Sequence, residues 1–128
     1  MGDVEELVVE ELLDGADLEA RDFAVAKRGG VEAHFVGFLP HKSGQRRKKL
    51  EELRSFAGTL VLYESAYRIE KLLAELNEVF PGRSVVLARE LTKKFEEFLR
   101  GTPAQLLEVA KKRPLKGEFV VLIDSLRL

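Results

Sequence analysis

Apolar residues along most of this chain fall in short continuous runs, which are separated by longer stretches with helical spacing. The runs that are typical of strands are Val31–Leu39, Thr59–Tyr63, Ser84–Ala88 and Phe119–Ile123. In the last three runs, apolar residues follow one another almost without a break. This pattern favours strands that are covered on both faces.

Amphipathic stretches lie between these runs and predict helices. They extend over Gln45–Phe56, over Tyr67–Phe80 and from Pro103 to about Lys112. Ser43 is the expected N-cap of the first helix. Thr102 and Gln105 fit a capping box at the start of the last helix, where Pro103 takes the first helical position.

Three segments have a weaker pattern. Val4–Leu13 predicts a short helix, Leu18–Lys27 fits a strand or a helical turn, and Leu91–Leu99 fits a helix or an irregular strand. Gly29 and Gly30 mark the one weak boundary. We therefore expect a poorly patterned N-terminal segment over residues 1–30 and an α/β domain over residues 31–128.

Strands and helices alternate along the chain after Val31. This order predicts an α/β fold, which we expect to be a three-layer sandwich around a mixed, largely parallel sheet. Val61, Val86 and Val121 are expected in its central strands.

Composition narrows the possible chemistry. The chain has 128 residues, no cysteine and two histidines, so disulfides and a cysteine nucleophile are excluded and no metal site is expected. Its net charge of −1 gives no global attraction to nucleic acid, so binding to nucleic acid would need a local basic patch. No apolar run approaches the roughly 18 residues of a membrane-spanning helix, and the acidic N-terminus does not resemble a signal peptide. We expect a cytoplasmic protein with no membrane partner.

A basic segment follows the first of the predicted strands. Its cations are Lys42, Arg46, Arg47, Lys48 and Lys49. They are suited to contact RNA phosphates, although a solvated helix face carries the same pattern and nearby glutamates offset part of the charge. Helical spacing predicts that Leu50 and Leu53 are buried. The residues expected to be exposed are Arg46, Arg47 and Lys49.

Two polar clusters stand directly after predicted strands. One is Tyr63–Arg68, and the other begins at Arg89. Ligands of open α/β sheets bind beyond the carboxyl ends of the strands, so both clusters are candidates for one polar site. The alternatives are structural: Ser65 as a helix N-cap, and an ion pair of Arg89 with Glu64 or Glu90.

No stand-alone catalytic constellation is visible. The glycines form neither a dinucleotide-binding pattern nor a phosphate-binding loop, and there is no nucleophile elbow. His34 lies in an apolar strand and is expected to be structural, while nothing near His41 orients it as a base. No catalytic residue is therefore assigned.

Four ordered segments, taken together, carry a resemblance. They are Gly37-Phe38-Leu39-Pro40 with Gly44-Gln45-Arg46-Arg47, Leu62-Tyr63-Glu64-Ser65 with Arg68, Arg89-Glu90-Leu91-Thr92-Lys93-Lys94-Phe95-Glu96-Glu97 with Arg100-Gly101-Thr102, and Lys116-Gly117-Glu118-Phe119-Val120. In this order and spacing they resemble the bacterial 16S rRNA (cytidine-2′-O)-methyltransferase family, part of the tetrapyrrole (corrin/porphyrin) methylase superfamily. The resemblance covers roughly Val31 to Asp124, the C-terminal domain of that family.

The resemblance implies a two-domain enzyme, usually a homodimer, that methylates RNA of the small ribosomal subunit. It also implies S-adenosylmethionine as the cofactor, held in the cleft between the two domains. The positions that match the family's motifs for this cleft are Tyr63, Glu64, Ser65, Arg89, Glu90, Thr92, Gly117 and Glu118. We therefore expect these residues to face the cofactor.

Two features depart from the family pattern. The family typically has Pro and His where this chain has Ala66 and Tyr67, and residues 1–30 do not match the family's N-terminal domain. We expect the chain to supply one half of a cofactor and RNA cleft, and on its own to show no methyl transfer and at best weak cofactor binding. The alternatives are a non-catalytic α/β module, either a fragment or an engineered piece, and a small RNA-binding domain that uses the basic face over residues 42–54.

Overall fold

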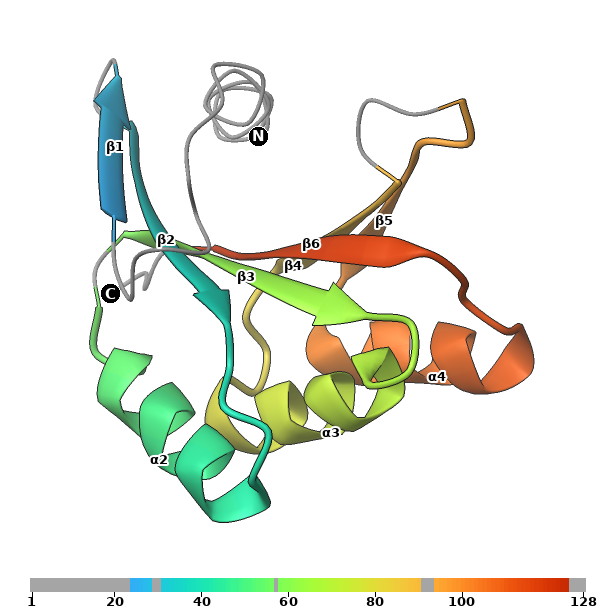
Figure 1. Cartoon of the computed structure of the whole chain (residues 1–128), viewed down its shortest axis with the longest axis horizontal. Coiled ribbons are helices and arrows are strands. Elements are labelled where there is room, and N and C mark those ends of the chain that lie inside the picture. The colour runs from blue at the N-terminus through green and yellow to red at the C-terminus, as the bar shows by residue number, and fades with distance from the viewer. Residues whose placement is uncertain (1–23, 29–30, 57, 91–93, 125–128) are drawn as a thin grey trace.

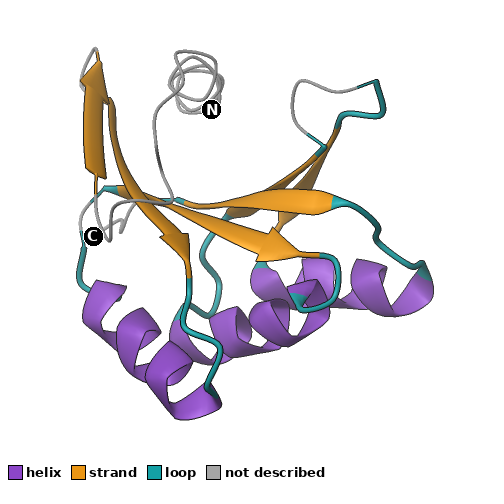
Figure 2. Cartoon of the chain, viewed as in Figure 1, coloured by secondary structure: helices purple, strands orange, loops and turns teal. Residues whose placement is uncertain are grey.

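The computed structural model describes residues 24–28, 31–56, 58–90 and 94–124. In these ranges the chain forms one mixed sheet, and the helices lie together on one of its faces (Figures 1 and 2). The helix expected over Val4–Leu13 lies outside the described residues.

The elements of secondary structure follow the predicted order. The strands are β1 Ala24–Arg28, β2 Val31–Phe38, β3 Thr59–Ser65, β4 Val85–Arg89, β5 Glu97–Gly101 and β6 Glu118–Ile123. The helices are α2 Ser43–Leu53, α3 Ile69–Val79 and α4 Pro103–Lys112. The four strands and three helices expected from the clear patterns are confirmed.

The two ambiguous segments contain strands. β1 pairs with β2 through Val25 and His34, so the sheet begins before the boundary that Gly29 and Gly30 suggested. β5 pairs with β4 in an antiparallel hairpin. Both strands lie at the edges of the sheet, where apolar patterning is weakest because fewer neighbours cover the strand.

The strand order is β1-β2-β3-β6-β4-β5. Among these strands only β2 and β3 pair in parallel, and every other neighbouring pair is antiparallel. The α/β class and the mixed sheet are confirmed, but the expectation of a largely parallel sheet is wrong. A buried apolar run reads the same in either direction, so hydrophobicity could not show that β6 enters between β3 and β4 and runs against both.

The main core lies between the sheet and the helices. Leu60 and Leu62 of β3 face Leu72, Leu73 and Leu76 of α3, and all five are fully buried. The alternate residues of the same strands form a second apolar cluster on the other face of the sheet, which includes Phe35, Val61, Val86 and Leu122.

The expected three layers are not what the described residues form. All three described helices cover one face of the sheet (Figure 2), so these ranges form two layers. The expected central strands are correct, because Val61, Val86 and Val121 lie in β3, β4 and β6. No helix in the described ranges is both long and apolar enough to cross a membrane.

Side-chain capping differs between the helices. The Thr102 hydroxyl accepts from the backbone N–H of Gln105, and the Gln105 side chain accepts from the backbone N–H of Thr102 at 2.9 Å, which confirms the capping box of α4. The expected N-cap of α2 is wrong. Lys42 takes that position, and Ser43 is the first helical residue, whose hydroxyl accepts from Lys71 Nζ at 2.9 Å.

Replacing Thr102 tests the capping box. Thr102→Ala leaves the backbone N–H of Gln105 without its side-chain acceptor, so the free energy of unfolding should fall by about 1 kcal/mol. Urea denaturation followed by circular dichroism measures this change. Ser55→Ala, which removes an exposed hydroxyl in the turn after α2, should change stability by less than about 0.5 kcal/mol. Equal effects of the two changes would contradict the role of the cap.

Candidate functional site

The polar clusters predicted after β3 and β4 meet at one edge of the sheet. Both strands are antiparallel to β6, so they run in the same direction on either side of it. Ser65 pairs with Glu118, while Glu64 and Arg89 both pair with Phe119. The end of β3, the start of β6 and the end of β4 thus form a polar rim that consists of residues 64–65, 117–118 and 89–90. Thr92, which was expected at the same site, lies outside the described residues.

Backbone hydrogen bonds hold the polar rim together. The N–H of Ala66 donates to the Gly117 carbonyl at 3.1 Å, and the N–H of Glu90 donates to the Glu118 carbonyl at 3.0 Å. The N–H of Glu118 in turn donates to Oε2 of Glu90 at 3.4 Å. Segments that are far apart in the sequence are therefore fixed to one another before any ligand binds.

Two rim residues have a left-handed backbone. Gly117 has a φ of 95°, and Glu90, which is not a glycine, has a φ of 51°. A Cβ atom at Gly117 would lie 2.6 Å from Cδ of Glu90, so any larger residue would displace that side chain. Non-glycine residues with a strained backbone often mark functional positions, so Glu90 is a candidate functional residue.

The alternation of side chains divides the motif at the end of β3. Glu64 points to the helical face and is buried, with 4% of its surface exposed. Tyr63 points to the opposite face, where it packs against the second apolar cluster and meets the Phe38 ring edge-on, with ring centroids 5.3 Å apart. Neighbouring residues of one motif therefore have separate roles.

Arg46 is the most unexpected residue of the site. It was expected to be exposed on the basic face, but only 1% of its surface is exposed. Its Nε and Nη2 atoms donate to Glu75 at 3.0 and 2.8 Å, and Nη2 also donates to Glu64 Oε2 at 3.3 Å. Nη1 donates to the Pro40 carbonyl at 3.4 Å. The expectation of an exposed, RNA-facing Arg46 is therefore wrong.

The spacing of α2 contained the signal for this burial. Arg46, Leu50 and Leu53 stand four and then three residues apart, so all three lie on the same stripe of the helix. Burial by itself lowers the pKa of the Arg46 guanidinium, but the hydrogen bonds and charges of Glu75 and Glu64 outweigh burial and raise that pKa. Arg46 therefore stays charged and holds Glu64, whose other oxygen accepts from the Ser65 N–H at 2.9 Å.

Arg89 fastens the opposite end of the polar rim. Its guanidinium pairs with Glu97 at 3.2 Å and donates to the carbonyls of Lys116 and Phe95. The suggested ion pair with Glu64 or Glu90 is therefore replaced by one with Glu97 across the β4–β5 hairpin. Arg113 also donates to Glu97, at 2.7 Å, and the hydrogen bonds of Arg113 and then Arg89 lower the pKa of Glu97.

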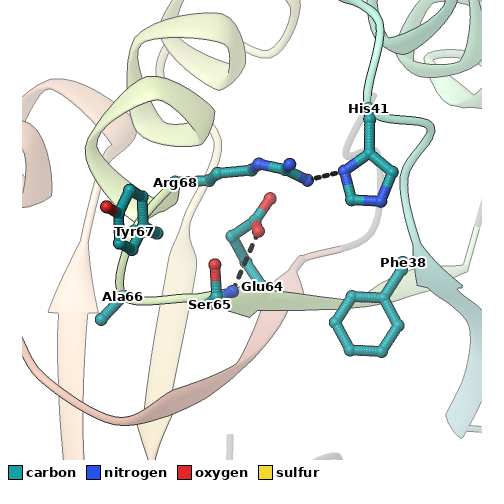
Figure 3. A pocket seen from close by; sticks show the side chains of 7 residues that line it. All are labelled: Phe38, His41, Glu64, Ser65, Ala66, Tyr67 and Arg68. Atoms are coloured by element: carbon teal, nitrogen blue, oxygen red, sulfur yellow. Dashed lines mark hydrogen bonds between the residues drawn. The ribbon is translucent and has the colours of Figure 1, made fainter.

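A pocket of about 530 Å³ opens beside the end of β3 (Figure 3). Its lining runs from Glu64 to Arg68 and includes Phe38, the last residue of β2, and His41 from the segment that leads from β2 to α2. The Arg68 guanidinium donates to Nδ1 of His41 across the pocket (Figure 3). Ser65 does not cap α3, because Arg68 occupies the N-cap position. We call this space the aromatic pocket.

The remaining cations of the predicted basic face are on the surface. Arg47 is exposed as predicted, and so are Lys42 and Lys48, but Lys49 was expected to be exposed and is half-buried. Leu50 and Leu53 are buried as predicted. Arg47 forms ion pairs with Glu51 at 3.5 Å and with Glu78. The face therefore carries less free positive charge than its sequence suggests.

The polar rim has the chemistry to hold a small polar ligand. The Ser65 hydroxyl and the carboxylates of Glu90 and Glu118 can hydrogen-bond the hydroxyl and ammonium groups of a nucleoside-containing cofactor. Glu118 is exposed, while Ser65 and Glu90 are half-buried. Among the described residues no group of three or more potential metal-ligating side chains gathers at one point.

Comparison with known proteins identifies the class of protein to which this mixed α/β sheet belongs, the tetrapyrrole methylases. Residues 22–107 match the family described as tetrapyrrole (corrin/porphyrin) methylases, and the chain belongs to this family. The fold is also that of cobalt precorrin-4 methyltransferase CbiF. That match has a TM-score of 0.57 and 15% identity, and it covers 93% of this chain and 48% of CbiF.

Relatives in sequence are more specific. Ribosomal RNA small subunit methyltransferase I of Halalkalibacterium halodurans is 41% identical over 91 residues, which cover 71% of this chain and 32% of that protein. The protein of the same name from Coprothermobacter proteolyticus is 48% identical over 89 residues, covering 70% of this chain and 39% of that protein. The chain thus spans about a third of the length of the relatives it matches.

Alanine substitutions of three glycines test how the polar rim is built. Gly117→Ala should lower the free energy of unfolding by more than about 2 kcal/mol, because it adds left-handed strain and displaces Glu90. Gly82→Ala has the same kind of backbone, with φ 78° and open space around it, so it should cost about 1 kcal/mol from strain alone. Gly44→Ala, in α2, should be neutral or slightly stabilising. Urea denaturation measures all three, and equal losses for Gly117 and Gly82 would refute the tight contact with Glu90.

Replacing Arg46 tests the buried ion network. Arg46→Met leaves two carboxylates without their cation and should lower the free energy of unfolding by about 3–5 kcal/mol near neutral pH. The matched control is Arg47→Met on the exposed side of α2, which should cost at most about 1 kcal/mol. Similar losses of stability for both variants would contradict the network.

Proposed function

We propose that this chain is a domain of an S-adenosylmethionine-dependent RNA methyltransferase and forms one wall of its cofactor and RNA cleft. The observation that carries this proposal is the meeting of three family-matching segments, 63–65, 89–90 and 117–118, at one edge of the sheet. The names of the related proteins support small-subunit ribosomal RNA as the substrate.

The residues that we propose to face the cofactor are Tyr63, Glu64, Ser65, Arg89, Glu90, Thr92, Gly117 and Glu118. When bound, S-adenosylmethionine would supply a methyl group activated by its sulfonium charge. The carboxylates of Glu90 and Glu118 are suited to a cationic ligand, and the missing side chain of Gly117 makes room for the Glu90 side chain against the backbone of the rim. Arg89 and Glu64 contribute by holding the rim in place, because their side chains already form ion pairs with Glu97 and Arg46.

RNA contacts are proposed for the exposed cations Lys42, Arg47, Lys48 and Lys49, without the buried Arg46. These cations begin just before α2 and extend along its outer side. Exposed lysines and arginines contribute to RNA affinity mainly through phosphate contacts, which are sensitive to salt. We also propose a cytoplasmic location, where ribosomes assemble, and a homodimer as the working form.

A second candidate is a non-catalytic α/β module that keeps the family core. The observation in its favour is the coverage, since the aligned part corresponds to about a third of the relatives. A single wall leaves much of a ligand in water, whereas small-molecule sites bury most of it. Methyl transfer also requires donor and acceptor to be held in near-attack geometry. We therefore expect these 128 residues alone to show no transfer to small ribosomal subunits.

Titration of the isotope-labelled chain with S-adenosylmethionine, followed by nuclear magnetic resonance, separates the two candidates. If the chain forms one wall of a cofactor site, it should bind S-adenosylmethionine with a dissociation constant on the order of 1 mM or weaker. The amide shifts should be confined to the polar rim, around Ser65, Glu90 and Glu118. Phe80, at the far end of α3, is the internal reference and should not respond.

A matched variant sharpens this test. Glu118→Gln keeps the size of an exposed side chain but removes its charge, so it should weaken the response of the rim without affecting stability. Absence of any rim response in the wild type would leave the non-catalytic module as the better description. Micromolar binding together with tritium-methyl transfer to ribosomal subunits would contradict the expectation that the isolated chain is inactive.

A further inference from the structure

Tyr67 is the most exposed large hydrophobic residue in the described part of the chain. Its exposed fraction is 99%, although it lies in the short turn between β3 and α3. The backbone on both sides of it is fixed, since Ala66 N–H donates to Gly117 at 3.1 Å and Arg68 N–H donates to Ser65 at 3.0 Å. The turn therefore presents a full aromatic face to solvent from an ordered backbone, so docking onto it costs little ordering entropy.

A second exposed ring completes the arrangement. Phe38 is 58% exposed at the end of β2, and it is braced by the edge-on contact with Tyr63. Phe38 and Tyr67 lie on opposite sides of the aromatic pocket, with Glu64 and Ser65 between them (Figure 3). The exposed lining of the pocket is mainly apolar, with an aromatic ring on each side. This arrangement suits the stacking of a planar ring.

The pocket has a basic side. Arg68 lines the pocket beside His41, Lys42 is the next residue after His41, and Lys71, one helical turn after Arg68, donates to the hydroxyl of Ser43 at the start of α2. The helices α2 and α3, of 11 residues each, also begin at this end of the sheet, so their partial positive charges add to those of the side chains. Glu70 is the acidic residue in the first turn of α3, while Glu64 is already held by Arg46.

From this arrangement we infer that the aromatic pocket is a nucleotide subsite for single-stranded RNA. A base stacks on Tyr67, with Phe38 on the other side, and the adjoining phosphates contact Arg68 and Lys42. Aromatic stacking platforms beside a basic path are how proteins hold single strands without reading their sequence. The inference deepens the proposed function and rests on it for RNA as the substrate class.

Charge distinguishes RNA from the other source of a nucleobase, the adenine of the cofactor. S-adenosylmethionine has a net positive charge at neutral pH, because its sulfonium and ammonium groups outnumber its single carboxylate, so Arg68, Lys42 and Lys71 disfavour it overall. The phosphodiesters of RNA are attracted by the same cluster. A protein partner would also use exposed aromatic and arginine side chains, and the experiment separates this case too.

The test measures binding of a fluorescein-labelled single-stranded RNA of about ten nucleotides by fluorescence anisotropy. A second RNA of equal length has abasic positions in its centre. Tyr67→Ala should weaken binding of the intact RNA about 5- to 150-fold and leave the abasic RNA nearly unaffected. Tyr67→Phe keeps the ring and should bind like the wild type. Arg68→Gln should weaken both RNAs and reduce the dependence of affinity on salt.

Phe95 provides the matched control. It is an exposed aromatic residue, at 69%, that lies outside the pocket just before β5, so Phe95→Ala should not change RNA affinity. Equal affinities of Tyr67→Ala and Phe95→Ala for intact RNA would overturn the subsite, as would absence of RNA binding by the wild type. Two further results would also overturn the subsite. One is that S-adenosylmethionine displaces the RNA from the wild type but not from Tyr67→Ala. The other is that Tyr67→Ala changes the oligomeric state.

The RNA subsite and the cofactor wall can be tested independently of each other. Titration of Tyr67→Ala with S-adenosylmethionine, followed by nuclear magnetic resonance, should give the same amide shifts in the polar rim as titration of the wild type. If the rim responds and RNA affinity does not depend on Tyr67, only the subsite is wrong. If RNA affinity depends on Tyr67 and the wild-type rim does not respond to the cofactor, the cofactor wall is wrong and the subsite is retained.

Discussion

The buried guanidinium of Arg46 joins the parts of the molecule on which the site depends. It extends from α2 to Glu75 of α3, to Glu64 at the end of β3 and to the carbonyl of Pro40 in the segment after β2. One planar fork therefore fixes the positions of two helices and of the strand end that carries the polar rim. Burial of one cation and two carboxylates is favourable only with such complete hydrogen bonding, so this corner of the fold tolerates little displacement.

The position of β6 has the second largest consequence. Because it runs against both β3 and β4, its first residues meet their last residues, and three segments share one edge. In a simple parallel sheet the start of the last strand would lie at the opposite edge. Gly117 and Glu118 then could not hydrogen-bond Ala66 and Glu90 as they do here. The antiparallel insertion is therefore what turns separate sequence motifs into a site.

The site is divided between the two faces of the sheet edge. Side chains that point to the helices, Glu64 and Arg89, are held in ion pairs and give the rim its shape. Ser65, Glu118 and the aromatic pocket are left accessible for ligands. A polar rim beside a pocket flanked by aromatic rings and cations places the proposed cofactor and RNA surfaces next to each other. A methyl transfer enzyme needs this proximity.

The sequence by itself determined the elements, since apolar periodicity reflects local geometry: β3, β4, β6, the three helices, the capping box at Thr102 and the burial of Leu50 all followed from it. It also located Glu64, Ser65, Arg89 and Glu118 at strand ends. Only the tertiary structure decided the direction of β6, the single helical layer of the described residues and the burial of Arg46. The direction of a buried strand leaves no mark in its hydrophobicity. The partner of a buried charge, here Glu75, lies 29 residues away and is brought close only by the packing of α2 against α3.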